Sequence, residues 1–144
     1  MTALPFVDEH HVVVAGSVAQ VWERLIRLLP GFASGGPLVH MLGTEPRYAS
    51  GTIPAEGSAL AGFKVERSVP GQLLLLTGRH RFSRYALTFT LTAQDGETLL
   101  AARTNAAFPG VLGFFYRQLV IGSGAHRVLV KRFLNQLRHE AMAR

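Results

Sequence analysis

His126 is the residue whose type and position best fit chemistry near neutral pH. It belongs to a predicted C-terminal helix, and on a helical wheel it falls on the same side as Leu129 and Phe133. An imidazole on such an apolar face can bind a polar ligand group or transfer a proton. The alternative is a buried histidine satisfied by a neighbouring backbone or hydroxyl group. The catalytic residues thus stay undefined, with His126 as the candidate acid or base.

A second set of candidates consists of aromatic, hydroxyl and basic side chains predicted to face inward from a sheet and from the same helix. Aromatic rings offer apolar surface, and hydroxyl groups can orient a ligand in an otherwise apolar pocket. Arg81 could bind a carboxylate or phosphate, with an exposed edge arginine as the simpler interpretation. Core packing is the alternative for the others. The candidate ligand-binding residues are Phe63, Arg81, Tyr85, Phe89, Thr104, Phe108, Phe115, Tyr116, His126 and Phe133.

Several kinds of site are not indicated. The chain has no cysteine, and His10 and His11 are adjacent on a predicted strand, so they should face opposite sides of it. The histidines show no metal-ligand spacing, and the glycines match no phosphate-binding loop. Aromatic residues follow the predicted core and do not interleave with basic ones, as a nucleic-acid platform would require. We expect no metal, no cofactor and no nucleic-acid partner.

Length and composition predict one globular domain, residues 1–144. The chain has 144 residues, of which 48% are hydrophobic and 17% are charged. The amino terminus does not resemble a signal peptide, and the leucine run at 73–76 is far too short to cross a bilayer. We therefore expect a cytoplasmic protein without a transmembrane segment. Arginine supplies 13 of the 15 Lys and Arg residues, which suggests a GC-rich bacterial genome.

Charge is distributed unevenly along the chain. Residues 1–78 carry five Lys or Arg against six Asp or Glu, whereas residues 79–144 carry ten against three. A basic half can indicate an anionic partner, but a solvated arginine-rich surface is the simpler interpretation. A homodimer is left open.

The first elements follow from strand and helix signals. Residues 6–15 predict a strand, and Ser17 with Gln20 forms a capping box that begins a helix ending near Leu29, before Pro30-Gly31. The helix has an apolar side, and we expect Glu23, Arg24 and Arg27 to point away from it. Residues 59–69 predict one strand, followed by a turn at Pro70-Gly71 and a strand over 72–77.

The second half shows the clearest periodicity. Residues 81–92 alternate, with Tyr85 and Phe89 on the inward face. Asp95-Gly96 predicts a hairpin turn, and residues 98–108 form the return strand. The apolar positions from 111 to 142 keep one helical phase, which predicts one long helix that could bend at Gly122-Ser123-Gly124. Its far side is basic.

This order of elements resembles the SRPBCC superfamily, which includes START lipid-transfer domains, the birch-pollen allergen family and polyketide cyclase/dehydrases. The similar segments are VVVAGSVAQVWERL (12–25), FKVERSVPGQLLLL (63–76) and RYALTFTLTAQDGETLLAART (84–104), followed by the long helix. The resemblance implies an α+β helix-grip fold, in which a curved antiparallel sheet wraps around a long C-terminal helix, and a cavity for an apolar ligand. Members share no universal catalytic residue, so none is transferred to this chain.

Three functions are consistent with these observations. The first is binding of a small hydrophobic or amphipathic molecule, such as a lipid or a polyketide, in a cavity between the sheet and the C-terminal helix. The second is a reaction of the polyketide cyclase or dehydratase kind in the same cavity, with His126 as acid or base. The third is a membrane- or protein-interaction module that uses the basic helix face.

Overall fold

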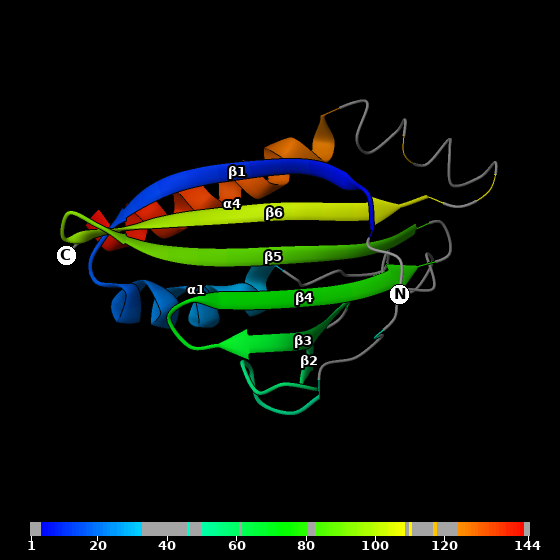
Figure 1. Ribbon diagram of the computed structural model, residues 1–144, viewed down its shortest axis with the longest axis horizontal. Coiled ribbons are helices and arrows are strands. Elements are labelled where there is room, and N and C mark those ends of the chain that lie inside the picture. The colour runs from blue at the N-terminus through cyan, green and yellow to red at the C-terminus, as the bar shows by residue number, and fades with distance from the viewer. Residues whose placement is uncertain are drawn as a thin grey trace.

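The chain forms one curved antiparallel sheet with helices on one of its faces. The computed structural model describes residues 4–32, 46, 50–60, 62–80, 83–108, 110, 117 and 124–142. Within these residues, six strands lie in the order β1-β6-β5-β4-β3-β2. Both helices lie on the same face of the sheet (Figure 1). The elements are β1 (Phe6–Ala15), α1 (Val18–Phe32), β2 (Ala59–Leu60), β3 (Phe63–Val69), β4 (Leu73–His80), β5 (Ser83–Gln94), β6 (Glu97–Ala107) and α4 (Ala125–Met142).

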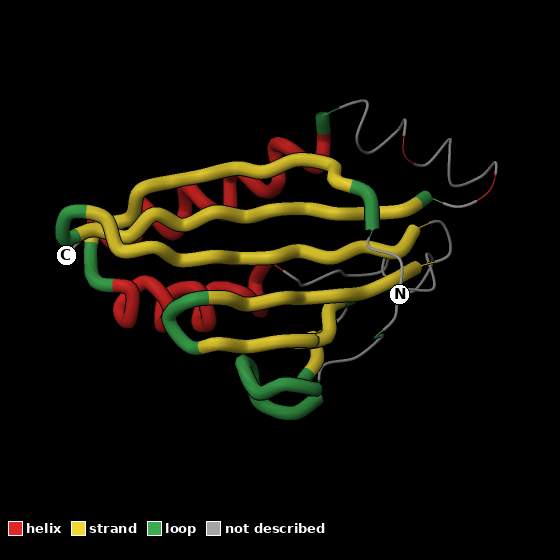
Figure 2. Tube along the Cα trace, in the orientation of Figure 1, coloured by secondary structure: helices red, strands yellow, loops and turns green. Residues whose placement is uncertain are grey.

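The predicted α+β helix-grip architecture is confirmed. Figure 2 shows the strands as one continuous layer, with α1 and α4 side by side behind it. One face of the sheet is apolar and must be covered, and α1 and α4 both pack on that face. We call this covered, concave side the inner face. Fully buried residues from both layers, such as Phe89, Leu25 and Leu137, form the core between them.

The capping box at the start of α1 is confirmed in both of its hydrogen bonds. The Ser17 backbone N–H donates to Gln20 Oε1 at 3.0 Å, and the Gln20 backbone N–H donates to Ser17 Oγ at 3.2 Å. Gly16 adopts a φ of 117°, a conformation that favours glycine and turns the chain from β1 into the helix. Local sequence therefore defines this helix start.

Two predictions for α1 are wrong. The helix does not end before Pro30 but continues to Phe32 with Pro30 inside it; near a helix end, proline removes a single backbone donor and its φ suits the helix. Arg24, expected to point away, is only 4% exposed. Its Nη1 donates to the carbonyl oxygen of Ala15 at 3.1 Å. A backbone carbonyl at the corner between strand and helix thus holds the guanidinium inside.

The single strand predicted over 59–69 is instead two antiparallel strands. β2 pairs with β3, with Ala59 opposite Lys64 and Leu60 opposite Phe63. Gly62, between them, has a φ of 86°, which a regular strand cannot include. Because Leu60 pairs with Phe63, the turn puts two residues three positions apart on one face and shifts the alternation by one residue. Ala59, Ala61 and Gly62 are too small to reveal this shift in the sequence.

The β5–β6 hairpin follows the prediction closely. Asp95 and Gly96 both have positive φ, 49° and 81°, as a two-residue type I′ turn requires. On β5, Leu87, Phe89 and Leu91 are buried, whereas their neighbours on the other parity are more exposed. The hairpin carries the centre of the inner face.

The structure does not contain an uninterrupted helix over residues 111–142, because the helix is broken at Gly124. Gly124 adopts a φ of 82°, which an α-helix cannot contain, and α4 begins at the next residue. Residues 111–116 and 118–123 lie outside the described part of the chain. On α4 the buried positions are Val130, Phe133, Leu134 and Leu137.

Leu129 was predicted to face the sheet, yet it is 53% exposed. Its position is at the edge of the apolar stripe, so a small rotation of the helix moves it out of the core. Leu129 lines an open groove beside α1 instead, as described below.

A close approach of three strands depends on Gly78. Gly78 pairs with Tyr85 across β4 and β5. A Cβ atom on Gly78 would lie 2.0 Å from the carbonyl oxygen of Gly62 and 2.7 Å from Tyr85 Cε1. Only glycine leaves room for the β2–β3 turn and the Tyr85 ring to pack there.

We expect Gly78→Ala to lower the free energy of unfolding by roughly 1–3 kcal/mol, the usual cost of overpacking, because backbone must move. The control is Gly31→Ala in α1, where an added Cβ meets no atom within 4 Å. That change should be neutral or stabilise by up to about 1 kcal/mol. Urea denaturation of both variants measures the difference, and equal stability would contradict the proposed close approach.

Candidate functional site

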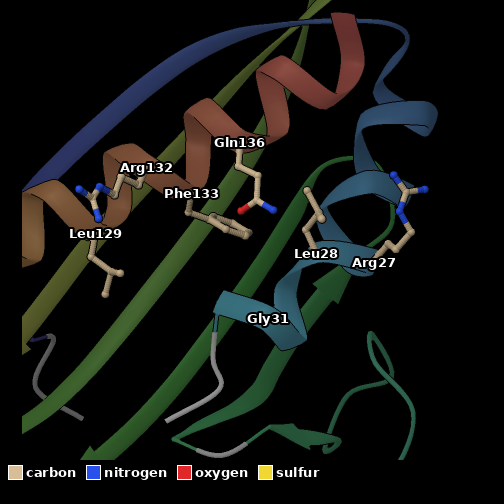
Figure 3. A pocket seen from close by; sticks show the side chains of 7 residues that line it. All are labelled: Arg27, Leu28, Gly31, Leu129, Arg132, Phe133 and Gln136. Carbon is tan, nitrogen blue, oxygen red and sulfur yellow. The ribbon is translucent and has the colours of Figure 1, made fainter. Parts of the chain in front are cut away.

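A groove opens on the helical side of the molecule, between the C-terminal half of α1 and α4. It has a volume of about 460 Å³. Leu28 and Gln136 face each other across it, and the ring of Phe133 points into the space between the helices (Figure 3). Its lining consists of Arg27, Leu28, Gly31, Leu129, Arg132, Phe133 and Gln136.

Phe133 connects this groove to the inner face of the sheet. Its ring lies 5.8 Å from that of Phe89, with an angle of 60° between the planes. Phe89 is fully buried in the middle of β5. The groove therefore lies above the centre of the sheet, where two of the predicted site residues meet.

Strand register places polar residues on the same inner face as Phe89. Phe89 is opposite Ala102, which is opposite His10. One step along the strands, Leu87 is opposite Thr104, which is opposite Asp8. Since side chains two residues apart share a face, Asp8 and His10 lie on the side that the helices cover.

Asp8 and His10 form a side-chain pair there. His10 Nε2 lies 3.3 Å from Asp8 Oδ2, and the side chains are 13% (His10) and 18% (Asp8) exposed. On the opposite face, His11 Nε2 lies 3.3 Å from Glu9 Oε1, with side chains that are 54% and 34% exposed. The two pairs have the same spacing and separation, but the inner pair is far less solvated.

The Asp8–His10 pair was not among the residues predicted for the site. Histidines 10 and 11 were correctly expected on opposite faces, but only as an argument against a metal site. The available signal was parity, because Asp8 and His10 alternate in phase with the buried residues Val12 and Val14.

The inner face is consequently divided into two regions. Toward the hairpin of β5 and β6 it is mainly apolar, with Leu91 and Leu100 opposite each other and both buried. Thr98, also buried at this end, donates its hydroxyl hydrogen to the carbonyl oxygen of Gly16. Toward the other end it gains hydroxyl and ionisable groups. These polar residues are Asp8, His10, Ser83, Tyr85 and Thr104. Such an apolar surface with a few polar groups at one end suits an amphipathic molecule.

The predicted site residues that the structure describes fall into three groups. Phe89 and Phe133 meet below the groove, as noted. Phe63 and Tyr85 meet at the far strands, with ring centroids 5.4 Å apart in an edge contact. The Tyr85 hydroxyl donates to the carbonyl oxygen of Gly62 at 2.7 Å.

Thr104 and Phe108 belong to the polar end of β6 and its continuation. Thr104 is buried and lies opposite Asp8, and Phe108 is half-buried just after the strand. Both occupy the region in which the hydroxyl and ionisable groups gather.

The remaining candidates are not described. Arg81, Phe115 and Tyr116 lie outside the described residues. His126 lies in the first turn of α4, and its side chain is not described. Its proposed role, and with it the cyclase- or dehydratase-like alternative, stays a prediction.

Neither a metal-binding cluster nor a membrane-spanning helix occurs among the described residues. No group of three or more His, Cys, Asp or Glu side chains in this part of the chain is arranged to hold a metal ion. Among the helices that the structure describes, none combines the length and apolar character needed to cross a membrane.

Comparison with known proteins shows similarity of structure without similarity of sequence. No family model matches the chain, and no curated protein does. The protein CV1439 from Chromobacterium violaceum is 15% identical, with a TM-score of 0.60 over 95% of this chain and 98% of that one. A conserved protein from Geobacillus kaustophilus is 16% identical, with a TM-score of 0.59 over 94% of each chain. Ara h 8.0201 is 10% identical, with a TM-score of 0.53 over 90% of this chain and 95% of that one.

These similarities extend over nearly the whole chain and show the fold. The protein has the helix-grip fold that its resemblance to the SRPBCC superfamily implies. Function has to be argued from the site, because one fold can support many activities.

The hydrogen bond from the Tyr85 hydroxyl to Gly62 predicts a stabilising role for this hydroxyl. Tyr85→Phe should destabilise the protein by about 1–2 kcal/mol, since the buried Gly62 carbonyl loses a hydrogen-bond donor. Ligand binding should not change. Thr77→Val is the control, because the Thr77 hydroxyl donates to Glu66 at an exposed site, where we expect less than about 0.5 kcal/mol. Thermal unfolding of the two variants tests the difference, and an unchanged Tyr85→Phe protein would contradict it.

Proposed function

We propose that the protein binds a small hydrophobic or amphipathic molecule, such as a lipid or a polyketide, between the sheet and the two helices. The groove between α1 and α4 carries this proposal. Its volume of about 460 Å³ lies within the range of roughly 300–1,000 Å³ that is common for small-molecule sites. The ligand enters through the groove and meets the inner face at Phe133.

The chemistry of the lining supports an amphipathic ligand. Leu28, Leu129 and Phe133 offer apolar surface. Arg132 and Gln136 supply donors at the rim, and both are exposed. An apolar body would lie against the leucines and the phenylalanine, while a polar group would meet the rim or the polar end of the sheet. The fold supports the same proposal, since the resemblance to SRPBCC proteins implies a cavity for apolar ligands.

Blocking the groove tests the proposal. Gln136→Trp places a large ring opposite Leu28 and should lower the affinity for the neutral fluorescent probe N-phenyl-1-naphthylamine at least about tenfold, or about 1.4 kcal/mol. The matched control is Asn135→Trp, the neighbouring exposed residue, which does not line the groove. Fluorescence titration measures both. Binding that is equally strong in both variants, or absent from the unaltered protein, would contradict the proposed site.

A second candidate function is docking on an anionic lipid surface. Val128 and Leu129 are 51% and 53% exposed at the start of α4. The exposed cations Arg127, Lys131 and Arg132 flank them. Apolar side chains within a basic surface favour contact with anionic membranes. Leu129 and Arg132 also line the groove, so a docked protein would present the groove to the lipid.

Vesicle binding tests this second candidate. Lys131→Glu/Arg132→Glu should abolish binding to vesicles that contain phosphatidylserine, and binding to the unaltered protein should fall steeply with salt. The control, Arg84→Glu/Arg103→Glu, makes the same change of charge on exposed residues of β5 and β6. Negligible binding of the unaltered protein, or equal loss in both double variants, would contradict a lipid-binding role for the α4 surface.

A further inference from the structure

We infer that Asp8 and His10 form a hydrogen-bond-accepting pair for an acidic hydroxyl group, a phenol or an enol, on the bound molecule. This inference rests on the proposed function and deepens it, because it names the polar group that the ligand carries. The pair lies on the inner face, 3.3 Å between Nε2 and Oδ2, at the polar end of β1.

The position of the pair fits a ligand that enters at the groove. His10, Ala102 and Phe89 form one row across three adjacent strands. Since neighbouring strands are about 4.8 Å apart, His10 lies roughly 10 Å from Phe89, about the length of two fused aromatic rings with a substituent. Phe89 in turn contacts Phe133 below the groove. Because Phe89, Ala102 and Phe133 are buried, a ligand that extends from the groove to His10 has to move the Phe133 ring away from Phe89.

The Asp8 and His10 side chains are mostly, but not fully, buried. His10 and Asp8 keep 13% and 18% of their side-chain surface exposed, so neither side chain is fully closed off from solvent. Partial burial removes most competing water, which strengthens a hydrogen bond to a ligand. Thr104, buried directly opposite Asp8, adds another polar group to this end of the sheet.

The chemistry of the pair makes it an acceptor. An ionised carboxylate has no hydrogen to donate, so the Nε2 atom that faces Asp8 carries the hydrogen and donates it. In the neutral imidazole the other nitrogen, Nδ1, is then an acceptor. A carboxylate partner also orients the ring. A phenol or enol O–H would donate to Nδ1, whereas an ether of the same size could not.

The protein contains its own control for this inference. Glu9 and His11 repeat the residue spacing and the 3.3 Å separation on the opposite face. His11 is 54% exposed, and the helices do not cover its side of the sheet. A property that belongs to any carboxylate–histidine pair would appear at both positions, whereas a ligand-binding role belongs to the inner pair alone.

The first experiment uses the unaltered protein. We expect it to bind 2-naphthol about tenfold more tightly than 2-methoxynaphthalene, as measured by calorimetry, since a net hydrogen bond of this kind supplies that ratio. The two probes share an apolar body, and only the first has an acidic hydroxyl. Equal affinity for the two probes would overturn the inference but leave the proposed function intact. If neither probe binds, both the inference and the proposed function are overturned.

The second experiment assigns the preference to the pair. His10→Gln keeps a polar side chain without the basic nitrogen, and it should reduce the affinity for 2-naphthol to that of the ether while leaving the ether unchanged. Asp8→Asn should reduce the preference as well. His11→Gln should preserve it in full. Circular dichroism confirms that each variant is folded, and a preference that survives both His10→Gln and Asp8→Asn would overturn the inference.

Discussion

The contact between Phe133 and Phe89 joins the C-terminal helix to the middle of the sheet. Both rings are buried, with 0% of Phe89 and 4% of Phe133 exposed. Because the sheet is curved and covered on one face only, its core depends on helices held at this central point. The same contact fixes the floor of the groove, so stability and the proposed binding site share one interaction.

The inner face then follows from the antiparallel register of three adjacent strands, β1, β6 and β5. The register aligns inward side chains of neighbouring strands into rows, and the side chains in a row determine whether that row is apolar or polar. The row with Leu91 and Leu100 is apolar, whereas the row with Thr104 and Asp8 is polar. A molecule lying along the strands would therefore meet a gradient from apolar to polar. This gradient connects the proposed hydrophobic ligand with the inferred hydroxyl-binding pair.

Local signals predicted much of this fold. The capping box of Ser17 and Gln20 and the turn at Asp95-Gly96 depend on neighbouring residues alone, and both were predicted correctly. The turn at Gly62 was missed, because the small residues around it hide the shift in alternation that the hairpin produces. Arg24 was misplaced, because its partner is a carbonyl group at the end of the preceding strand. Such a partner appears only once the strand and the helix are packed together.

The sequence by itself determined the strands of the β5–β6 hairpin, the start of α1 and the division between inward and outward residues on those strands, because periodicity and capping act over a few residues. Only the tertiary structure decided which inward residues meet. The alignment of His10 with Phe89 requires, besides the local β5–β6 hairpin, the pairing of β1 with β6, which lie far apart in the chain. The groove requires α1 and α4 to diverge, so that Leu129 lies in the open rather than in the core. These features depend on the packing of whole elements, which no local pattern records.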